Sequence, residues 1–200
     1  MDEEIEAIER NNSWKLSELP EGKKTVGVKW VYKTKLKENG EVDKYKACLV
    51  VKGYKQEFGV DYQEVFTSVA RHDTIKLVIS LAAQNSWPVF QPDVKLAFLH
   101  GDLDEQVFIE QTPSYVKVGN EHKVYKLKRA LYGLKQAPRA WYSRIEAYFL
   151  KEGFQKCPYK HTLFTKTEGE KMLIVCLYVD DLIYTGNDKA MFDKFKKSDG

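Results

Sequence analysis

The chain has few cysteines, and the three that it has, Cys48, Cys157 and Cys176, lie far apart in the sequence. They form neither the paired spacing of a zinc site nor a disulfide framework, which is typical of a reducing intracellular compartment. No run approaches the roughly 18 apolar residues of a membrane span. The acidic start of the chain is unlike a secretory signal peptide. We therefore expect an intracellular protein without a membrane partner.

Repeats and low-complexity segments are also missing, whereas apolar and aromatic residues are plentiful. Hydrophobic residues make up 43% and aromatic residues 13% of the 200 residues, enough for a real core. The net charge is only +3, but ten lysines lie between Lys23 and Lys55, and seven lysines and arginines lie between His122 and Ile145. These tracts fit a surface that faces a polyanion, and they fit solvated strand faces equally well.

The hydrophobic periodicity predicts helices and strands in a mixed order. Helices are expected over 2–10, 72–87, 139–153 and 187–198, and strands over 25–36, 41–54, 88–103, 105–113, 161–166, 171–179 and 182–186. Residues 123–138 are expected to run from a basic strand into a glycine-containing loop. Residues 11–22 are predicted to be a polar connector. This order predicts an α+β fold with a largely antiparallel sheet.

Residues 25–54 form the most distinctive local pattern. Asn39-Gly40 separates two strand-like runs, and this dipeptide is a strong hairpin signal. Lysines recur along both runs. A long basic ribbon suits contact with a nucleic-acid backbone, and the alternative is an edge hairpin that its lysines keep soluble.

Two aspartates interrupt an apolar run in "LYVDDLIYTG", residues 177–186. Asp180 and Asp181 are predicted to form the two-residue tip of a hairpin, where a solvated turn is one interpretation. Asp93 interrupts a second apolar segment. If the two segments pair, three carboxylates could hold two Mg²⁺ ions for an in-line phosphoryl displacement.

These residues carry a resemblance to a known family. Tyr178-Val179-Asp180-Asp181 resembles the Tyr-X-Asp-Asp motif of reverse transcriptases. The stretches 28–71, "DVKLAFLHG" (93–101) and "KVYKLKRALYGLKQAPRAWY" (123–142) are similar to the Ty1/copia-type retrotransposon polymerase. The chain is therefore expected to be a truncated RNA-dependent DNA polymerase domain of a Pol polyprotein.

The resemblance implies a right-hand polymerase fold with fingers and an antiparallel palm sheet. Residues 1–19 would be an N-terminal connector, 20–87 and 107–137 the fingers, and 88–106 and 138–200 an incomplete palm. The thumb is expected to be absent. Integrase and RNase H domains would belong to the parent polyprotein, and the compartment would be the cytoplasm, in a virus-like particle, or the nucleus.

The resemblance also implies roles for individual residues. Asp93, Asp180 and Asp181 would be catalytic and, with the backbone carbonyl of Val94, would bind two Mg²⁺ or Mn²⁺ ions. The residues implied to contact the nucleotide are Lys46, Phe98, Gly133, Lys135 and Pro138. Phe98 would be a steric gate against the 2′-OH, or an ordinary core residue. Substrates would be dNTPs and an RNA or DNA template with its primer.

Four positions depart from the family pattern. Cys48 stands where the family usually has an arginine, whose planar fork grips phosphate as a cysteine cannot. Pro92, Leu96 and His72 also differ, and Pro92 would remove a strand hydrogen bond.

Two interpretations besides an active polymerase stay open. The chain could be a catalytically inactive retrotransposon relic, or a nucleic-acid-binding module without polymerase activity. It could also be a basic α+β interaction domain whose aspartate pair is only a turn.

Overall fold

The computed structural model describes residues 1–66 and 69–198. Residues 67–68 and 199–200, which fall in the ranges predicted for fingers and palm, lie outside it. The fold is α+β, as predicted, and its paired strands are antiparallel. Contacts divide the chain into a first unit, residues 1–66 and 98–141, and a second unit, residues 67–97 and 142–200. None of the helices in the described ranges is long and apolar enough to cross a membrane.

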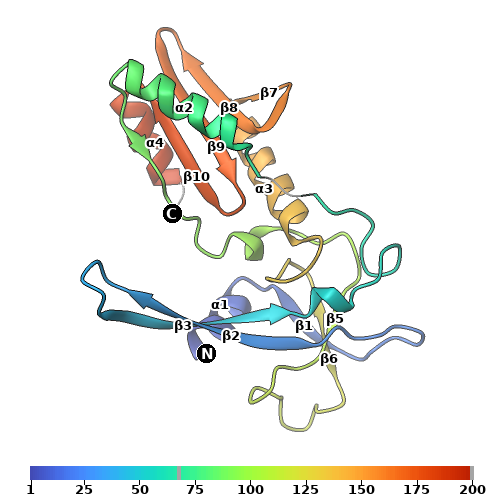
Figure 1. The fold of residues 1–200 in the computed structure, drawn as a ribbon. Helices are drawn as coiled ribbons and strands as arrows, with labels where there is room; N and C mark the ends of the chain where they lie inside the picture. Colours follow the sequence, from blue (N-terminus) through green and yellow to red (C-terminus); the bar gives the residue numbers. More distant parts are fainter. Residues whose placement is uncertain (67–68, 199–200) are drawn as a thin grey trace. The chain divides into compact units, whose positions relative to one another are not determined.

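The first unit combines a three-stranded sheet, a two-stranded ribbon and one helix (Figure 1). Strand order in the sheet is β1-β6-β5, and the ribbon pairs β2 with β3. The elements are α1 (Asp2–Arg10), β1 (Trp14–Ser17), β2 (Val28–Leu36), β3 (Val42–Val51), the 3₁₀ turns η1 (Gly53–Lys55) and η2 (Ala97–His100), β5 (Phe108–Ile109) and β6 (Val124–Leu127).

Apolar residues from the sheet, the ribbon and α1 form the core of the first unit. Ile8 on α1 and Ile109 on β5 are fully buried. Trp14 and Tyr125 are diagonal neighbours on β1 and β6, and their rings stack with centroids 4.2 Å apart. The prediction of a polar connector over 11–22 was therefore wrong at Trp14–Ser17, which forms a strand because Trp14 has this partner.

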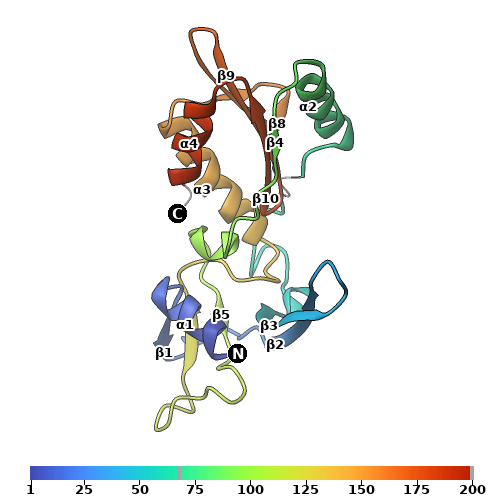
Figure 2. The same cartoon turned by 90° about the vertical axis from the view of Figure 1, so that its left-hand side faces the viewer.

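The second unit is a five-stranded antiparallel sheet with helices on both faces (Figure 2). Strand order is β4-β10-β9-β8-β7. The elements are α2 (His72–Gln84), β4 (Val89–Phe90), α3 (Ala137–Lys151), which begins in the first unit, β7 (Gln155–Cys157), β8 (Lys160–Glu168), β9 (Lys171–Tyr178), β10 (Asp181–Gly186) and α4 (Lys189–Ser198).

Aromatic rings fill the space between this sheet, α3 and α4. Phe149 lies 4.8 Å from Phe164, and Tyr184 lies 5.0 Å from Phe195, measured between ring centroids. Phe90 stacks on Tyr184 at 4.9 Å. Because Phe90 sits on β4, this contact fixes a short edge strand to the middle of the core. Of the strand predicted over 88–103, only Val89–Phe90 forms a regular strand. An irregular segment and then the 3₁₀ turn η2 follow it.

Gly133 shows how closely one loop of the first unit approaches β3. Its φ is +92°, and a Cβ built on it would lie 2.1 Å from the Val51 carbonyl oxygen. The Val51 N–H donates to the Tyr132 carbonyl at 2.8 Å, so this contact is part of the backbone hydrogen-bond network. No side chain fits there without moving the strand.

We expect Gly133→Ala to destabilise the protein by about 3 kcal/mol or more, because left-handed backbone and steric overlap both oppose it. Gly119→Ala is the matched control, since Gly119 has φ +78° but a Cβ built on it would have nothing within 4 Å. The control should cost about 1 kcal/mol. Urea unfolding measures both, and equal losses would contradict the steric argument.

Candidate functional site

The β9–β10 hairpin holds two of the three predicted catalytic aspartates. Asp181 pairs with Tyr178, so the two-residue tip is Val179-Asp180. The prediction that Asp180 and Asp181 together form the tip was wrong by one residue, because Asp181 is the first residue of β10. Val179 has φ +60°, the pattern of a type II′ turn, which favours glycine at this position. A β-branched residue there costs about 1–2 kcal/mol.

Asp93 lies directly beside Asp181. The two residues form an antiparallel bridge, flanked by hydrogen bonds of 3.1 Å from Val94 N–H to the Asp180 carbonyl and from Leu182 N–H to the Pro92 carbonyl. Pro92 thus takes part through its oxygen alone, at the edge of the sheet, where a missing N–H is tolerated. The predicted pairing of the two apolar segments is present in the structure.

We call Asp93, Asp181, Tyr178 and Val69 the carboxylate row, because consecutive members are paired across the end of the sheet. Directly opposite residues of an antiparallel pair place their side chains on one face. Asp181 therefore shares its face with Asp93, and the neighbouring Leu182 points to the opposite face, into the core.

The carboxylates repel one another. Asp93 is exposed, and Asp180 and Asp181 are half-buried. Burial, followed by the negative charges of Asp180 and Asp93, raises the pKa of Asp181 above its ordinary value. A cation at this place would relieve the repulsion and lower that pKa.

The residues fit a divalent ion by their chemistry, since carboxylate oxygens are the ligands that Mg²⁺ and Mn²⁺ prefer. Over residues 1–66 and 69–198, however, no group of three or more His, Cys, Asp or Glu side chains is placed to hold a metal ion. The backbone thus brings the donors together, while their side chains do not converge on one point.

The segment after Asp93 carries a second strained residue. Leu96 has φ +58°, again a left-handed conformation in a non-glycine residue. In the first unit, Phe98 is only 8% exposed, and its ring meets the Tyr132 ring edge-on at 4.7 Å. The position of Phe98 is thus that of a packed residue, and its role as a steric gate stays a prediction.

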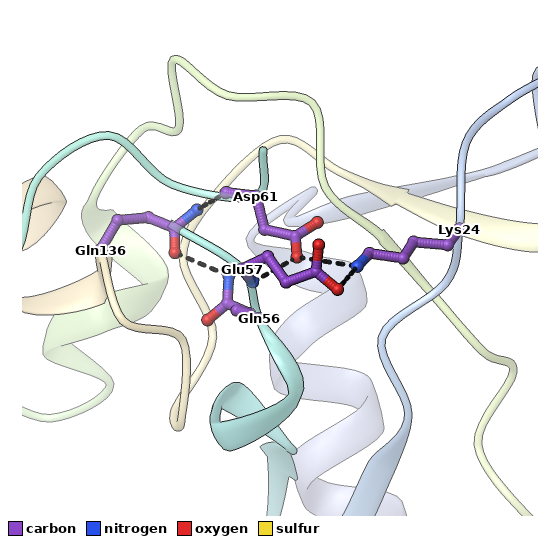
Figure 3. A network of polar contacts seen from close by, with 5 residues as sticks. All are labelled: Lys24, Gln56, Glu57, Asp61 and Gln136. Carbon is purple, nitrogen blue, oxygen red and sulfur yellow. Dashed lines mark hydrogen bonds and ion pairs between the residues drawn. The ribbon is translucent and has the colours of Figure 1, made fainter. Parts of the chain in front are cut away.

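Gly133 and Lys135 belong to a loop that a pair of glutamines fixes to the segment after β3, whereas Pro138 lies in the first turn of α3. Figure 3 shows the two glutamines, Gln56 and Gln136. Gln56 Nε2 donates to Gln136 Oε1 at 3.0 Å, and Gln136 is fully buried. The Lys135 N–H donates to Gln56 Oε1 at 2.8 Å. Buried amides with satisfied partners hold a loop in one conformation.

The same network continues to the surface. Gln136 Nε2 donates to the Asp61 carbonyl at 3.0 Å, and the Glu57 N–H donates to the Asp61 carboxylate at 2.8 Å. Lys24 pairs with Glu57 at 2.5 Å (Figure 3). Gln56 and Gln136 were not among the residues predicted from the sequence. Nothing in their local pattern marks them, since glutamine is usually exposed.

Lys46, the last predicted nucleotide contact, lies on the β2–β3 ribbon. It is directly opposite Lys33, and Lys44 is opposite Lys35. Cys48 follows Lys46 on the same face. Burial raises the pKa of the Cys48 thiol, and Glu4 adds to this effect.

The structure thus groups the predicted residues in two sets. The three aspartates, Val94, Tyr178 and Val179 lie together in the second unit. Phe98, Gly133, Lys135, Pro138 and Lys46 lie in the first unit, where the glutamine pair orders the loop that carries Gly133 and Lys135.

Comparison with known proteins gives consistent matches along almost the whole chain. The profile of the family described as reverse transcriptase (RNA-dependent DNA polymerase) matches residues 11–199. The retrovirus-related Pol polyprotein from transposon TNT 1-94 of Nicotiana tabacum is 41% identical over 98% of this chain and 15% of its own length. That from transposon RE1 of Arabidopsis thaliana is 40% identical over 96% of this chain and 13% of its own length.

A yeast relative is more distant. The transposon Ty1-BL Gag-Pol polyprotein of Saccharomyces cerevisiae is 28% identical over 76% of this chain and 8% of its own length. The chain therefore spans only a small part of the curated relatives that it matches.

We expect Asp181→Asn to stabilise the protein at neutral pH by about 0.2–1 kcal/mol, because it removes a charge that burial and then the carboxylates of Asp180 and Asp93 disfavour. The pKa of Asp181 is raised in the folded state, so its ionisation opposes folding as the pH rises through that pKa. The gain should therefore vanish at pH values below the ordinary aspartate pKa. Urea unfolding of both proteins, from neutral pH to below the ordinary aspartate pKa, measures this difference in the free energy of unfolding. A gain that does not depend on pH would argue against an effect of the Asp181 charge.

Proposed function

Because the chain belongs to the reverse transcriptase (RNA-dependent DNA polymerase) family, we propose that Asp93, Asp180 and Asp181 are the carboxylates of its nucleotidyl-transfer site. The observation that supports this most is the Asp93–Asp181 bridge, which joins carboxylates from two distant segments on one face. The reaction is attack of a primer 3′-OH on the α-phosphorus of a dNTP, with pyrophosphate leaving.

Two divalent ions, Mg²⁺ or Mn²⁺, would supply charge neutralisation at the attacking and leaving oxygens. Asp93, Asp180, Asp181 and the Val94 carbonyl would hold them, after side-chain rotation brings the carboxylates together. The exposed position of Asp93 leaves its side chain free to rotate. The strained tip at Val179 keeps Asp180 beside the row.

Residues of the first unit would bind the nucleotide. Lys46 and Lys135 would meet the triphosphate, and Gly133 and Pro138 would shape the loop that the glutamine pair orders. Phe98, held by its contact with Tyr132, would discriminate against the 2′-OH.

At the level of the fold, we assign the ribbon to the fingers and the five-stranded sheet to the palm of a right-hand polymerase. The partners would be an RNA or DNA template with its primer, and dNTPs. Since the relatives are Pol polyproteins many times longer than this chain, integrase and RNase H activities would belong to the parent polyprotein.

A binding module without polymerase activity is the second candidate. It is favoured by the resemblance, which places Cys48 where an arginine is expected to contact phosphate. Such a relic would keep the basic ribbon and bind nucleic acid without extending a primer.

Primer extension separates the two candidates. On poly(rA)/oligo(dT) with Mg²⁺ or Mn²⁺, the chain should incorporate dTMP, and Asp181→Asn should lower the rate at least about 100-fold, since metal-held charge contributes several kcal/mol. Asp193→Asn is the matched control because Asp193 is exposed on α4. Salt-sensitive binding without incorporation would favour the binding module.

We further expect Cys48→Arg to lower the KM for dTTP about tenfold, because an arginine fork adds charge-assisted hydrogen bonds to phosphate. Cys48→Lys is the control that adds the charge without the fork, and it should lower the KM less. Steady-state primer extension gives both constants. If lysine and arginine act equally, only net charge matters at this position.

A further inference from the structure

The glutamine pair Gln56–Gln136 forms the middle of a chain of hydrogen bonds that runs in one direction (Figure 3). The chain of bonds begins at the Lys135 N–H, which donates to Gln56 Oε1 at 2.8 Å. It ends at the Asp61 carbonyl, to which Gln136 Nε2 donates at 3.0 Å. A backbone N–H can only donate and a carbonyl oxygen can only accept. The backbone groups at the two ends therefore fix the orientation of both side-chain amides.

Position 56 requires a side chain that offers both an acceptor and a donor. Gln56 and Gln136 are buried, and a buried polar group that loses its partner keeps the full cost of its desolvation. The Gln56 N–H also donates to the Gly53 carbonyl at 3.1 Å. No Cβ fits on Gly53, because it would overlap the Gly133 carbonyl oxygen. The segment after β3 and the loop that carries Lys135 are thus in direct backbone contact beside Gln56.

This attachment fixes the Lys135 backbone relative to β3, the strand that carries Lys46. Both lysines belong to the first unit. The Lys135 side chain is exposed, whereas its backbone N–H is held by Gln56. Lys46 is half-buried on β3, a few residues before the segment that carries Gln56. A charged side chain on a fixed backbone has less conformational freedom to lose when it binds a ligand.

We propose that Gln56 is a positioning residue, which holds Lys135 at the place relative to Lys46 where both lysines bind the triphosphate of a dNTP. This inference rests on the proposed function in taking a nucleoside triphosphate as the ligand. Gln56 acts through the Lys135 N–H and the Gln136 side chain. When their hydrogen bonds are broken, the loop adopts other conformations. The apparent affinity then falls with the fraction of molecules that keep the competent one.

Gln56→Glu tests this role, because a glutamate gains a donor only when it is protonated. The ionised carboxylate accepts from the Lys135 N–H but has nothing to donate to Gln136 Oε1. Rotation of the Gln136 amide only moves the mismatch to the Asp61 carbonyl. The protonated acid restores the donor, and burial raises the pKa of a glutamate at this position. The hydrogen-bond chain should therefore be restored as the pH falls.

Other charged groups lie near position 56, and the wild type carries all of them. Lys55 and Glu57 flank it and are exposed, as is the Lys135 side chain. At the surface end of the network, Lys24 lies 2.5 Å from Glu57 and 3.8 Å from the Asp61 carboxylate. The ratio of variant to wild type at each pH therefore isolates the group at position 56.

Steady-state primer extension on poly(rA)/oligo(dT) measures the KM for dTTP and kcat from weakly acidic to weakly alkaline pH. The KM of Gln56→Glu should exceed that of the wild type at least about tenfold at alkaline pH and approach it at acidic pH, with kcat little changed. Gln63→Glu is the matched control, since Gln63 is exposed in the same segment and donates to the Gly59 carbonyl at 3.2 Å. A KM ratio that does not depend on pH, or an effect on kcat alone, would overturn the proposal.

Calorimetric titration with tripolyphosphate gives a readout that does not need polymerase activity. Gln56→Met keeps the length of the side chain and removes both hydrogen bonds, so it should weaken binding at least about fivefold. In a Lys135→Ala background it should have little further effect, because residues that act together are not additive. Additive losses, or a wild type that does not bind tripolyphosphate, would overturn the proposal. If Gln56→Met does not fold, Gln56→Glu at alkaline pH takes its place in the cycle.

These outcomes are distinct from failure of the proposed function. A chain that binds tripolyphosphate with this coupling but extends no primer refutes polymerase activity and leaves the positioning role of Gln56 standing. A chain that extends primers while Gln56→Glu shows a KM ratio independent of pH refutes the positioning role alone.

Discussion

The pairing of residues 89–94 with β10 is the constraint on which the carboxylate row depends. Only two residues of β4 form a regular ladder, so the backbone bridge at Asp93 would be weak alone. Phe90 stacks on Tyr184, and Thr185 donates its hydroxyl to the Pro88 carbonyl at 2.8 Å. Apolar packing on one face of the sheet thus holds two like charges together on the other. A shift of one residue in the pairing of this edge would move the Asp93 side chain to the opposite face of the sheet. The position of Asp93 beside Asp181 therefore depends on this register.

Of the five non-glycine residues with positive φ in the described ranges, the two with bulky apolar side chains lie near the proposed reaction centre. Val179 and Leu96 are in left-handed conformations, and both lie within a few residues of an aspartate of the site. Asp181 has a raised pKa because it is partly buried and its neighbours are negative. Each feature costs stability, and each is held by surrounding structure that is well packed. Strain and unbalanced charge of this kind are typical of sites that bind a charged ligand.

Much of this fold could be predicted from the sequence, because its helices and hairpins leave local signals. Helix 2–10, the Asn39-Gly40 hairpin and the β9–β10 hairpin follow from periodicity and turn chemistry. The strand Trp14–Ser17 could not be predicted, since its cause is a ring on β6 far along the chain. The proximity of Asp93 and Asp181 was only a conditional expectation for the same reason. The Gln56–Gln136 pair was missed because burial of a polar residue is decided by its partner.

The two sets of proposed functional residues rest on separate cores. The carboxylate row depends on the aromatic packing of the second unit, whereas the ribbon and the glutamine-ordered loop depend on the core of the first. Under the proposed function, a substitution at position 48 would therefore alter the nucleotide-binding surface and leave the backbone that brings Asp93 to Asp181 in place. In the proposed function, the three aspartates would serve the metal ions and the ribbon the nucleotide, so substitutions in the two units should affect different steps.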